Sequence, residues 1–235
     1  MRADPVALVV GAGALAGWLA PAAAAVAPPV AALFHLPLRL PTGRGIALTF
    51  DDGPHPEGTP AVLEALDRAG ASATFFLVGE QVERRAALVA EIAAAGHEVG
   101  VHGYRHTLLV RRRPGAVRDD LSRATAVIED ATGRPALSYR PPYGVFSLAA
   151  LRIVREHFSP LLWSRWGRDW ERQATPASIA ALAARDLGPG DVVLLHDADY
   201  YSAEGSWRRT VEALPAVLDA ALATGEPLVT PSEST

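Results

Sequence analysis

The chain has 235 residues, a net charge of −4 at pH 7 and no cysteine. Its length fits one larger domain, or a smaller domain with an extension. The acidic balance argues against a nucleic-acid binder, whose footprint is a basic face. Without cysteine there can be no disulfide and no thiolate ligand, so any metal must be held by His, Asp or Glu.

Apolar residues dominate the N-terminal segment, which we place at residues 1–41 together with a short linker. Between Asp4 and Arg39 no side chain carries a formal charge. The segment fits a signal peptide, an uncleaved membrane anchor, or a helical hairpin broken at Pro21 that packs on the domain. We favour membrane association through residues 5–37, which predicts an anchored or secreted protein of the cell envelope. The alternative is a soluble cytoplasmic protein.

Strands and helices alternate over residues 42–235, which we interpret as one domain. The predicted strands are 45–48, 73–78, 98–101, 136–140, 159–163 and 191–195, with 227–229 as a candidate last strand. The predicted helices are 59–69, 85–95, 114–131, 147–157, 175–187 and 208–223. Such alternation predicts an α/β fold with a parallel sheet, either open or closed.

Polar residues follow five of the predicted strands. They are Asp51–Asp52, His102, Arg140, Asp169 and His196–Asp197. In parallel α/β folds, functional side chains gather at the carboxyl ends of the strands. Asp51-Asp52-Gly53-Pro54 taken alone is also an ordinary turn sequence. Five polar clusters at the same strand end favour a functional site over a set of unrelated turns.

Two adjacent carboxylates and two histidines suggest a metal site. Asp51 and Asp52 repel each other unless a cation compensates them, and a divalent cation would leave one as ligand and the other as base. His102 and His106 are four residues apart, which on a helical turn puts both imidazoles on one face. With Asp52 they would form a site of two histidines and one carboxylate that suits zinc, and also iron or cobalt. The alternative is a pair of surface histidines on a loop.

The remaining polar residues fit metal-assisted hydrolysis of an acyl bond. Asp51 is the candidate base for a water molecule, and His196 is the candidate acid for the departing group. Asp169 could keep that imidazole protonated near neutral pH. Arg140 can clamp and orient a carboxylate bidentately. The backbone N–H of Tyr143 is placed to help stabilise an oxyanion.

Five sequence motifs occur in a recognisable order. They are Thr-Phe-Asp-Asp-Gly-Pro at 49–54, two histidines at 102 and 106, Arg-Pro-Pro-Tyr-Gly at 140–144, Asp-Trp at 169–170 and Leu-Leu-His at 194–196. As a set they resemble the motifs of the polysaccharide deacetylase family, the NodB-homology domain of carbohydrate esterase family 4. The resemblance covers roughly residues 45–227 and implies a distorted (β/α) barrel with about seven parallel strands.

By this resemblance, the chain would remove N-acetyl groups from amino sugars of a polysaccharide, peptidoglycan or glycolipid. Its ligands for one divalent metal ion, expected to be Zn²⁺, would be Asp52, His102 and His106. The partner would be an acetylated glycan or glycolipid, and no protein partner can be inferred. The alternatives are an inactive metal-containing carbohydrate-binding module and a hydrolase of a small cyclic amide on the same scaffold.

The resemblance also implies roles for residues outside the ligand set. Asp51 would be the base and would be oriented by Arg140. His196 would be the acid and would be supported by Asp169. The two remaining roles are in substrate binding: Leu194 would line the acetyl pocket, and the Tyr143 backbone would complete the oxyanion site.

Two positions depart from the family pattern. Gly103 stands where the family usually has Ser or Thr, so we expect a looser metal-binding loop that still holds its metal. Trp166 stands where the first Asp of the fourth motif usually lies. If that Asp is the residue that tunes the acid, Asp169 is only a partial substitute, which puts the pKa of His196 in question.

Overall fold

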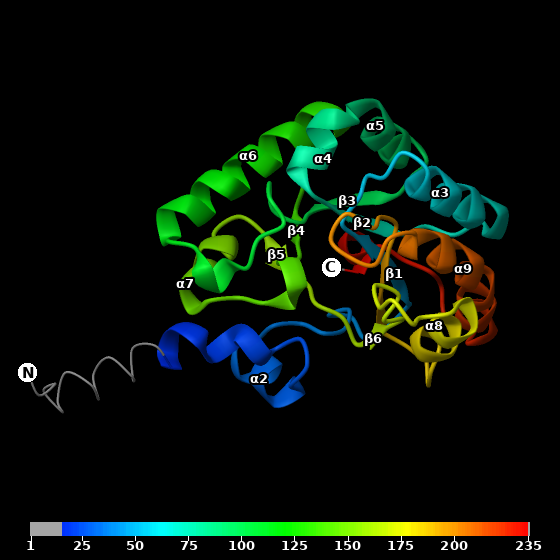
Figure 1. Ribbon diagram of the computed structural model, residues 1–235. Coiled ribbons are helices and arrows are strands. Elements are labelled where there is room, and N and C mark those ends of the chain that lie inside the picture. The colour runs from blue at the N-terminus through cyan, green and yellow to red at the C-terminus, as the bar shows by residue number, and fades with distance from the viewer. Residues whose placement is uncertain (1–15, 235) are drawn as a thin grey trace, which may run out of the picture.

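The computed structural model describes residues 16–234, and the part of the predicted N-terminal unit that precedes residue 16 lies outside the described residues. Figure 1 shows a curled sheet with helices packed around its outer side. The strands are β1 Ala47–Asp51, β2 Thr74–Leu77, β3 Glu98–Val101, β4 Ser138–Tyr139, β5 Ser159–Pro160, β6 Arg165–Trp166 and β7 Val192–His196.

These strands form one seven-stranded sheet in the order β5-β4-β3-β2-β1-β7-β6, and all of the pairings between them are parallel. The sheet is a curled half-barrel, which confirms the expected distorted (β/α) barrel of about seven parallel strands. The central strands β1, β2 and β7 are buried along their whole length. Their near-continuous apolar runs are typical of parallel strands that are covered on both faces.

Helices cover the outer side of the sheet. They are α2 Pro28–Leu33, α3 Gly58–Ala69, α4 Gly79–Arg84, α5 Ala86–Ala94, α6 Pro114–Thr132, α7 Leu148–Val154, α8 Pro176–Ala183 and α9 Ser206–Ala223. Short 3₁₀ helices lie at Ala20–Ala23, Leu109–Arg111, Pro142–Gly144 and Pro231–Ser234. Local signals set several ends: Gly70 and Gly133 end α3 and α6 in the left-handed conformation, and Thr175 begins α8 with a capping box.

Three elements differ from the prediction. The short strand β6 lies between the predicted strand at 159–163 and the predicted helix at 175–187, and its two residues pair with Val193 and Leu194 of β7. A two-residue strand is too short to show the alternation by which strands are recognised in a sequence. The candidate last strand at 227–229 contributes only an isolated bridge between Ile46 and Leu228. The helix expected at 85–95 is preceded by the unpredicted α4 and separated from it at Arg85.

The described part of the N-terminal segment packs against the domain. Ala24, Ala31 and Leu36 are buried in the hydrophobic core, and the Trp18 indole donates a hydrogen bond to the Val110 carbonyl at 3.0 Å. Val26 is 67% exposed on the same segment. Within residues 16–234, no helix combines the length and the apolar character needed to cross a bilayer. The boundary at residue 41 and the cell-envelope location stay predictions.

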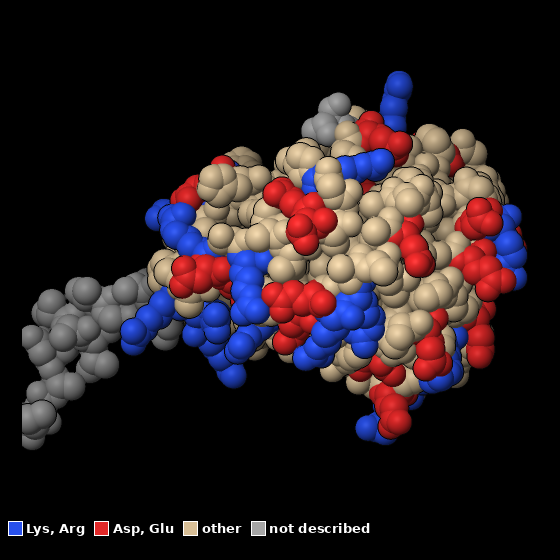
Figure 2. Space-filling view, turned by 90° about the horizontal axis from the view of Figure 1, so that it is seen from above, with Lys and Arg blue, Asp and Glu red and all other residues tan. Residues whose placement is uncertain are grey.

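Charged side chains are interspersed on the molecular surface. Figure 2 shows arginines in blue among aspartates and glutamates in red on one face of the molecule. Exposed ion pairs such as Arg208–Glu57, 3.0 Å apart, belong to a class that contributes little to stability, because water screens both charges. The buried ion pairs lie instead at the carboxyl edge of the sheet.

Candidate active site

The site is organised around Asp51 and Asp52, where β1 ends. Asp51 is the last residue of the strand and lies opposite His196 in the register of β1 and β7. Asp52 has a φ of 79° and turns the chain out of the strand. Both carboxylates line a cavity of about 240 Å³. The other predicted site residues that line this cavity are His102, His106, Tyr143, Leu194 and His196.

Asp52, His102 and His106 form a compact cluster. One ligand atom from each lies within 4.8 Å of the other two, and Asp52 Oδ1 is 3.4 Å from His102 Nε2 and 3.2 Å from His106 Nε2. Among residues 16–234, the buried Asp52 Oδ1 has no hydrogen-bond partner. A buried carboxylate oxygen facing two imidazole nitrogens fits a divalent cation, so the donor set suits the metal that the sequence predicts.

The pKa values in this cluster favour the states that bind a metal. Burial opposes ionisation of Asp52, but contact with His102 and the charges of His196 and His106 outweigh it and lower the pKa of Asp52 to about 2. Burial lowers the pKa of His106 to about 4, so its imidazole is neutral at pH 7. A metal requires the deprotonated form of both groups.

The loop from His102 to His106 is not a helical turn, so that part of the prediction is wrong. Gly103 has a φ of 82° and reverses the chain, yet the two imidazole centroids still lie 5.3 Å apart. Asp120 of α6 holds the loop, because it accepts hydrogen bonds from the backbone N–H of Tyr104 at 2.8 Å and of Arg105 at 3.4 Å.

Gly103 makes room for this support. A Cβ added at Gly103 would lie 3.1 Å from Asp120 Oδ2 and 3.2 Å from the Arg105 carbonyl oxygen. The loop that we expected to be looser is therefore tied to α6 by a carboxylate. No local signal in the sequence marks Asp120, because it lies 16 residues beyond Tyr104 and meets it only through the packing of α6.

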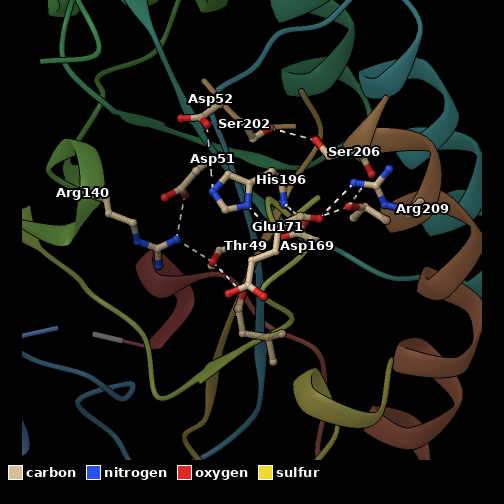
Figure 3. Close-up of polar contacts among 12 residues, drawn as sticks. Thr49, Asp51, Asp52, Arg140, Asp169, Glu171, His196, Ser202, Ser206 and Arg209 are labelled. Carbon is tan, nitrogen blue, oxygen red and sulfur yellow. Dashed lines mark hydrogen bonds and ion pairs between the residues drawn. The ribbon is translucent and has the colours of Figure 1, made fainter. Parts of the chain in front are cut away.

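Arg140 is fully buried behind Asp51. Figure 3 shows its contacts with Asp51 and Thr49: Nη1 donates to Asp51 Oδ1 at 2.8 Å and to Thr49 Oγ1 at 2.7 Å. Nε and Nη2 donate to the carbonyls of Leu161 at 3.0 Å and Leu162 at 2.9 Å. The contact with Asp51 is therefore through one nitrogen and not bidentate as predicted, because backbone carbonyls occupy the other donors. Arg140 itself does not line the cavity.

His196 and Asp169 form a second buried pair on the other side of the cavity. His196 Nδ1 lies 2.9 Å from Asp169 Oδ1, and Asp169 Oδ2 accepts from the His196 backbone N–H and from Thr210 Oγ1, both at 2.7 Å. Burial alone lowers the pKa of His196, but the charge and hydrogen bond of Asp169 outweigh it and raise the pKa to about 10. The remaining nitrogen, Nε2, is 4.0 Å from Asp52 Oδ2. A dashed line in Figure 3 marks this contact.

Trp166 does not take the place of a carboxylate beside His196. It lines the cavity together with Trp163 and Trp170, and the Trp170 ring meets the His196 ring edge to face at 5.4 Å. All three tryptophans line the cavity, and the carboxylate beside His196 Nδ1 is that of Asp169.

Two predicted substrate-binding residues lie at different depths. Leu194 is buried on β7 and lines the cavity, whereas the Tyr143 side chain is 54% exposed at its rim. Tyr143 has a φ of 61° within the 3₁₀ turn that follows β4. Tyr201 also lines the cavity, from the loop that follows β7.

The same chain matches proteins of known family. Residues 40–158 match the model of a family described as polysaccharide deacetylase. A peptidoglycan-N-acetylglucosamine deacetylase of Bacillus cereus is 35% identical over 192 residues, which cover 80% of this chain and 86% of that protein. A chitooligosaccharide deacetylase of Azorhizobium caulinodans is 34% identical over 188 residues, which cover 77% of this chain and 89% of that protein.

A solved structure shares the architecture. It is a family 4 acetyl xylan esterase from Clostridium thermocellum in complex with a cobalt ion, with a TM-score of 0.74 and 29% sequence identity. The superposition covers 80% of this chain and 89% of that chain.

Proposed function

Because this chain belongs to the polysaccharide deacetylase family, we propose that it is a metal-dependent hydrolase that removes the N-acetyl group from an amino sugar of a glycan. The observation that carries the proposal is the meeting of three groups at one cavity. They are the cluster of Asp52, His102 and His106, the pair of Asp51 and Arg140, and the pair of His196 and Asp169.

Asp52, His102 and His106 would hold the metal. A divalent cation there supplies a Lewis acid that polarises the acetyl carbonyl and makes a water molecule more acidic. Zn²⁺ is the ion we expect, because one carboxylate and two imidazoles leave open positions of the kind that catalytic zinc uses. The orphaned Asp52 Oδ1 supports this assignment.

Asp51 would act as the general base. Its Oδ1 accepts from Arg140 at 2.8 Å, so Oδ2 is the atom that can take a proton from the attacking water. Arg140 fixes the orientation of the carboxylate through this bond. In this role Asp51 is not itself a metal ligand.

His196 would act as the general acid. Since Asp169 contacts Nδ1, the proton that can be transferred is on Nε2, and a pKa of about 10 keeps it there at neutral pH. As the C–N bond of the acetamide breaks, Nε2 would protonate the departing amine nitrogen. The products are acetate and the free amino sugar. The backbone N–H of Tyr143 would help to stabilise the oxyanion, and Leu194 would face the acetyl methyl group.

The substrate we propose is a glycan that contains N-acetylglucosamine. The names of both reported relatives support this choice, since one is a peptidoglycan-N-acetylglucosamine deacetylase and the other a chitooligosaccharide deacetylase. The aromatic wall of Trp163, Trp166 and Trp170 offers apolar faces against which a sugar ring could pack. The apolar segment at 5–37 leads us to propose that the glycan is one of the cell envelope.

Acetate release tests the function directly. N-acetylglucosamine oligomers, peptidoglycan and acetylated xylan are incubated with the chelated and the zinc-reconstituted protein, with Asp51→Asn as the inactive control. We expect release from the first two substrates that requires zinc and Asp51. Absence of release from every acetylated glycan by a protein that binds metal would leave the inactive binding module as the better interpretation. Release from xylan alone would replace the amide substrate by an ester.

The proposed location needs a separate measurement. Fractionation of producing cells, with mass determination of the recovered protein, distinguishes an anchored chain from a cleaved and secreted one. Recovery of the full-length chain from the cytoplasm alone would contradict the envelope assignment.

A further inference from the structure

The two histidines of the proposed metal site are supported differently. His102 Nδ1 contacts the Arg140 carbonyl oxygen at 2.8 Å, which fixes the ring and leaves Nε2 for the metal. Among residues 16–234, the buried His106 Nδ1 has no hydrogen-bond partner. Histidine ligands almost always donate their second N–H to a carbonyl or carboxylate, which sets the ring orientation. Something else must therefore orient His106.

Aromatic rings take the place of the missing hydrogen-bond partner of His106. The Tyr201 ring stacks on His106 with a centroid distance of 4.1 Å and an interplanar angle of 11°. Tyr143 meets His106 at 4.4 Å but at 58°, and its side chain is 54% exposed. Of the two, only Tyr201 covers the imidazole with a parallel face, so it restricts the rotation of the ring about χ2.

Tyr201 is itself fixed at its far end. Its hydroxyl donates to Glu80 Oε1 at 2.9 Å and accepts from Gln81 Nε2 at 3.4 Å. Burial, together with the Glu80 carboxylate, raises the pKa of Tyr201, so the phenol stays protonated as a donor.

The helix that carries Glu80 and Gln81, α4, also holds the loop from His102 to His106. Within α4, Gly79 N–H donates to the Gly103 carbonyl at 2.9 Å, and Glu80 N–H donates to the Tyr104 carbonyl at 3.0 Å. The start of α4 therefore contacts both the backbone of the loop and the ring that covers His106. These contacts make the stack a fixed part of the site.

We propose that Tyr201 is a positioning residue for the metal centre: its stacked ring sets the orientation of the His106 imidazole in place of a hydrogen bond at Nδ1. The inference rests on the proposed metal site and goes one step beyond it. Tyr201 lies in the loop between β7 and α9, outside the five sequence motifs, so it would add a support to the ligand set that the motifs do not contain.

The test measures metal binding rather than turnover. Zinc affinity of the full chain is determined by competition with a chromophoric chelator for the wild type, Tyr201→Ala and Tyr201→Phe. The d–d absorption spectrum of the Co²⁺ form reports the ligand geometry. We expect Tyr201→Ala to weaken zinc binding by about 10- to 100-fold, as for other groups that orient ligands, and to change the cobalt spectrum. Tyr201→Phe keeps the ring, so its zinc affinity should lie within about threefold of the wild-type value. Its cobalt spectrum should match that of the wild type.

Tyr200→Ala is the matched control. Tyr200 is the adjacent residue of the same loop. Its ring packs on His55 at 5.3 Å and meets the Tyr201 ring edge to face at 6.2 Å, whereas the ring that stacks on His106 is that of Tyr201. We expect this variant to bind zinc as the wild type does. If it weakens binding as much as Tyr201→Ala, collapse of the loop explains the effect and the proposal is overturned. The proposal is equally overturned if Tyr201→Phe binds as weakly as Tyr201→Ala, or if Tyr201→Ala binds normally.

The outcomes separate this inference from the proposed function. A wild-type chain that binds neither zinc nor cobalt contradicts the metal site itself. A wild-type chain that binds zinc, with an unaffected Tyr201→Ala variant, contradicts only the role of Tyr201. Should thermal unfolding show that Tyr201→Ala does not fold, Tyr201→Leu replaces it under the same criteria, because leucine keeps the bulk without a planar face.

Discussion

Two buried ion pairs each place one side chain, Asp51 or His196, on the wall of the same cavity, and they differ in what they can do with a proton. Arg140 contacts Asp51 at 2.8 Å, and His196 contacts Asp169 at 2.9 Å. In the first pair the cation is a guanidinium, which stays charged at any pH of interest. In the second pair it is an imidazole, which can lose its proton.

The difference supports the roles proposed above. Arg140 holds the Asp51 carboxylate through a cation that keeps its charge, which suits a base with a fixed orientation. A titratable cation beside the buried Asp169 carboxylate suits an acid that gives up a proton and regains it. One strand edge thus brings the proposed acid and the proposed base to one cavity, each with a different kind of charged partner.

Among the substitutions in the two ion pairs, Asp51→Asn should have the largest effect on activity, because it removes the carboxylate proposed as the base and leaves Arg140 in place. We expect the rate of acetate release to fall by about 10²- to 10⁴-fold, the usual contribution of a general base. Zinc content should not change, since Asp52, His102 and His106 remain. A variant that keeps more than a tenth of the wild-type rate would remove Asp51 from the base role.

Arg140→Gln tests how much the Arg140–Asp51 pair contributes to the free energy of unfolding. It leaves the buried Asp51 carboxylate and two backbone carbonyls without their donor, so we expect the free energy of unfolding to drop by about 3–5 kcal/mol. Urea unfolding monitored by circular dichroism measures this change. Arg208→Gln, which breaks the exposed pair with Glu57, is the control and should unfold like the wild type. Equal stability of both variants would mean that the buried pair contributes nothing.

Asp169→Asn tests the titratable pair through pH. Asp169 raises the pKa of His196 to about 10, so the neutral variant should lower that pKa. The acid is active only while protonated, and its activity is lost as pH rises through its pKa. We therefore expect the alkaline limb of kcat/KM to move to lower pH by more than about one unit, with a loss of about tenfold at pH 8. If the alkaline limb does not move, a group other than His196 produces it.

Thr210→Val should have the smallest effect. It removes one of three contacts of Asp169 and leaves the carboxylate charged, with its bond to the His196 backbone N–H intact. We expect a loss of about 1 kcal/mol in the free energy of unfolding. The alkaline limb should stay in place, which separates loss of a hydrogen bond from loss of charge. A shift as large as that of Asp169→Asn would show that Thr210 controls the orientation of the carboxylate.

Much of the fold could be predicted because it rests on local signals. The apolar runs at 73–78 and 191–195 lie over β2 and β7, and Gly133 ends α6 as expected. The short strand β6 escaped prediction because two residues carry no periodicity, and its place at the sheet edge depends on pairing with β7. The helical turn assumed for His102 and His106 failed because Gly103 adopts a positive φ.

The candidate site, like the fold, could be predicted from the sequence only in part. Residue types and strand-end positions in the sequence pointed to Asp51, Asp52, His102, His106 and His196, because parallel strands bring their carboxyl ends to one edge. The motif resemblance also predicted the pairs of Arg140 with Asp51 and of Asp169 with His196, but the other contacts that hold these side chains could not be predicted in this way. Within residues 16–234, Arg140 donates two of its four side-chain hydrogen bonds to the carbonyls of Leu161 and Leu162, which follow β5. Asp120 reaches the loop from His102 to His106 from a helix.

The sequence by itself therefore determined an α/β chain with carboxylates and histidines at its strand ends, since these follow from apolar runs, turn residues and motif order. Only the tertiary structure decided that Thr210 contacts Asp169, that Asp120 holds the loop beside Gly103, and that Tyr201 covers His106. Each of these contacts joins elements distant in the chain. Their geometry depends on strand order and helix packing, which no local pattern specifies.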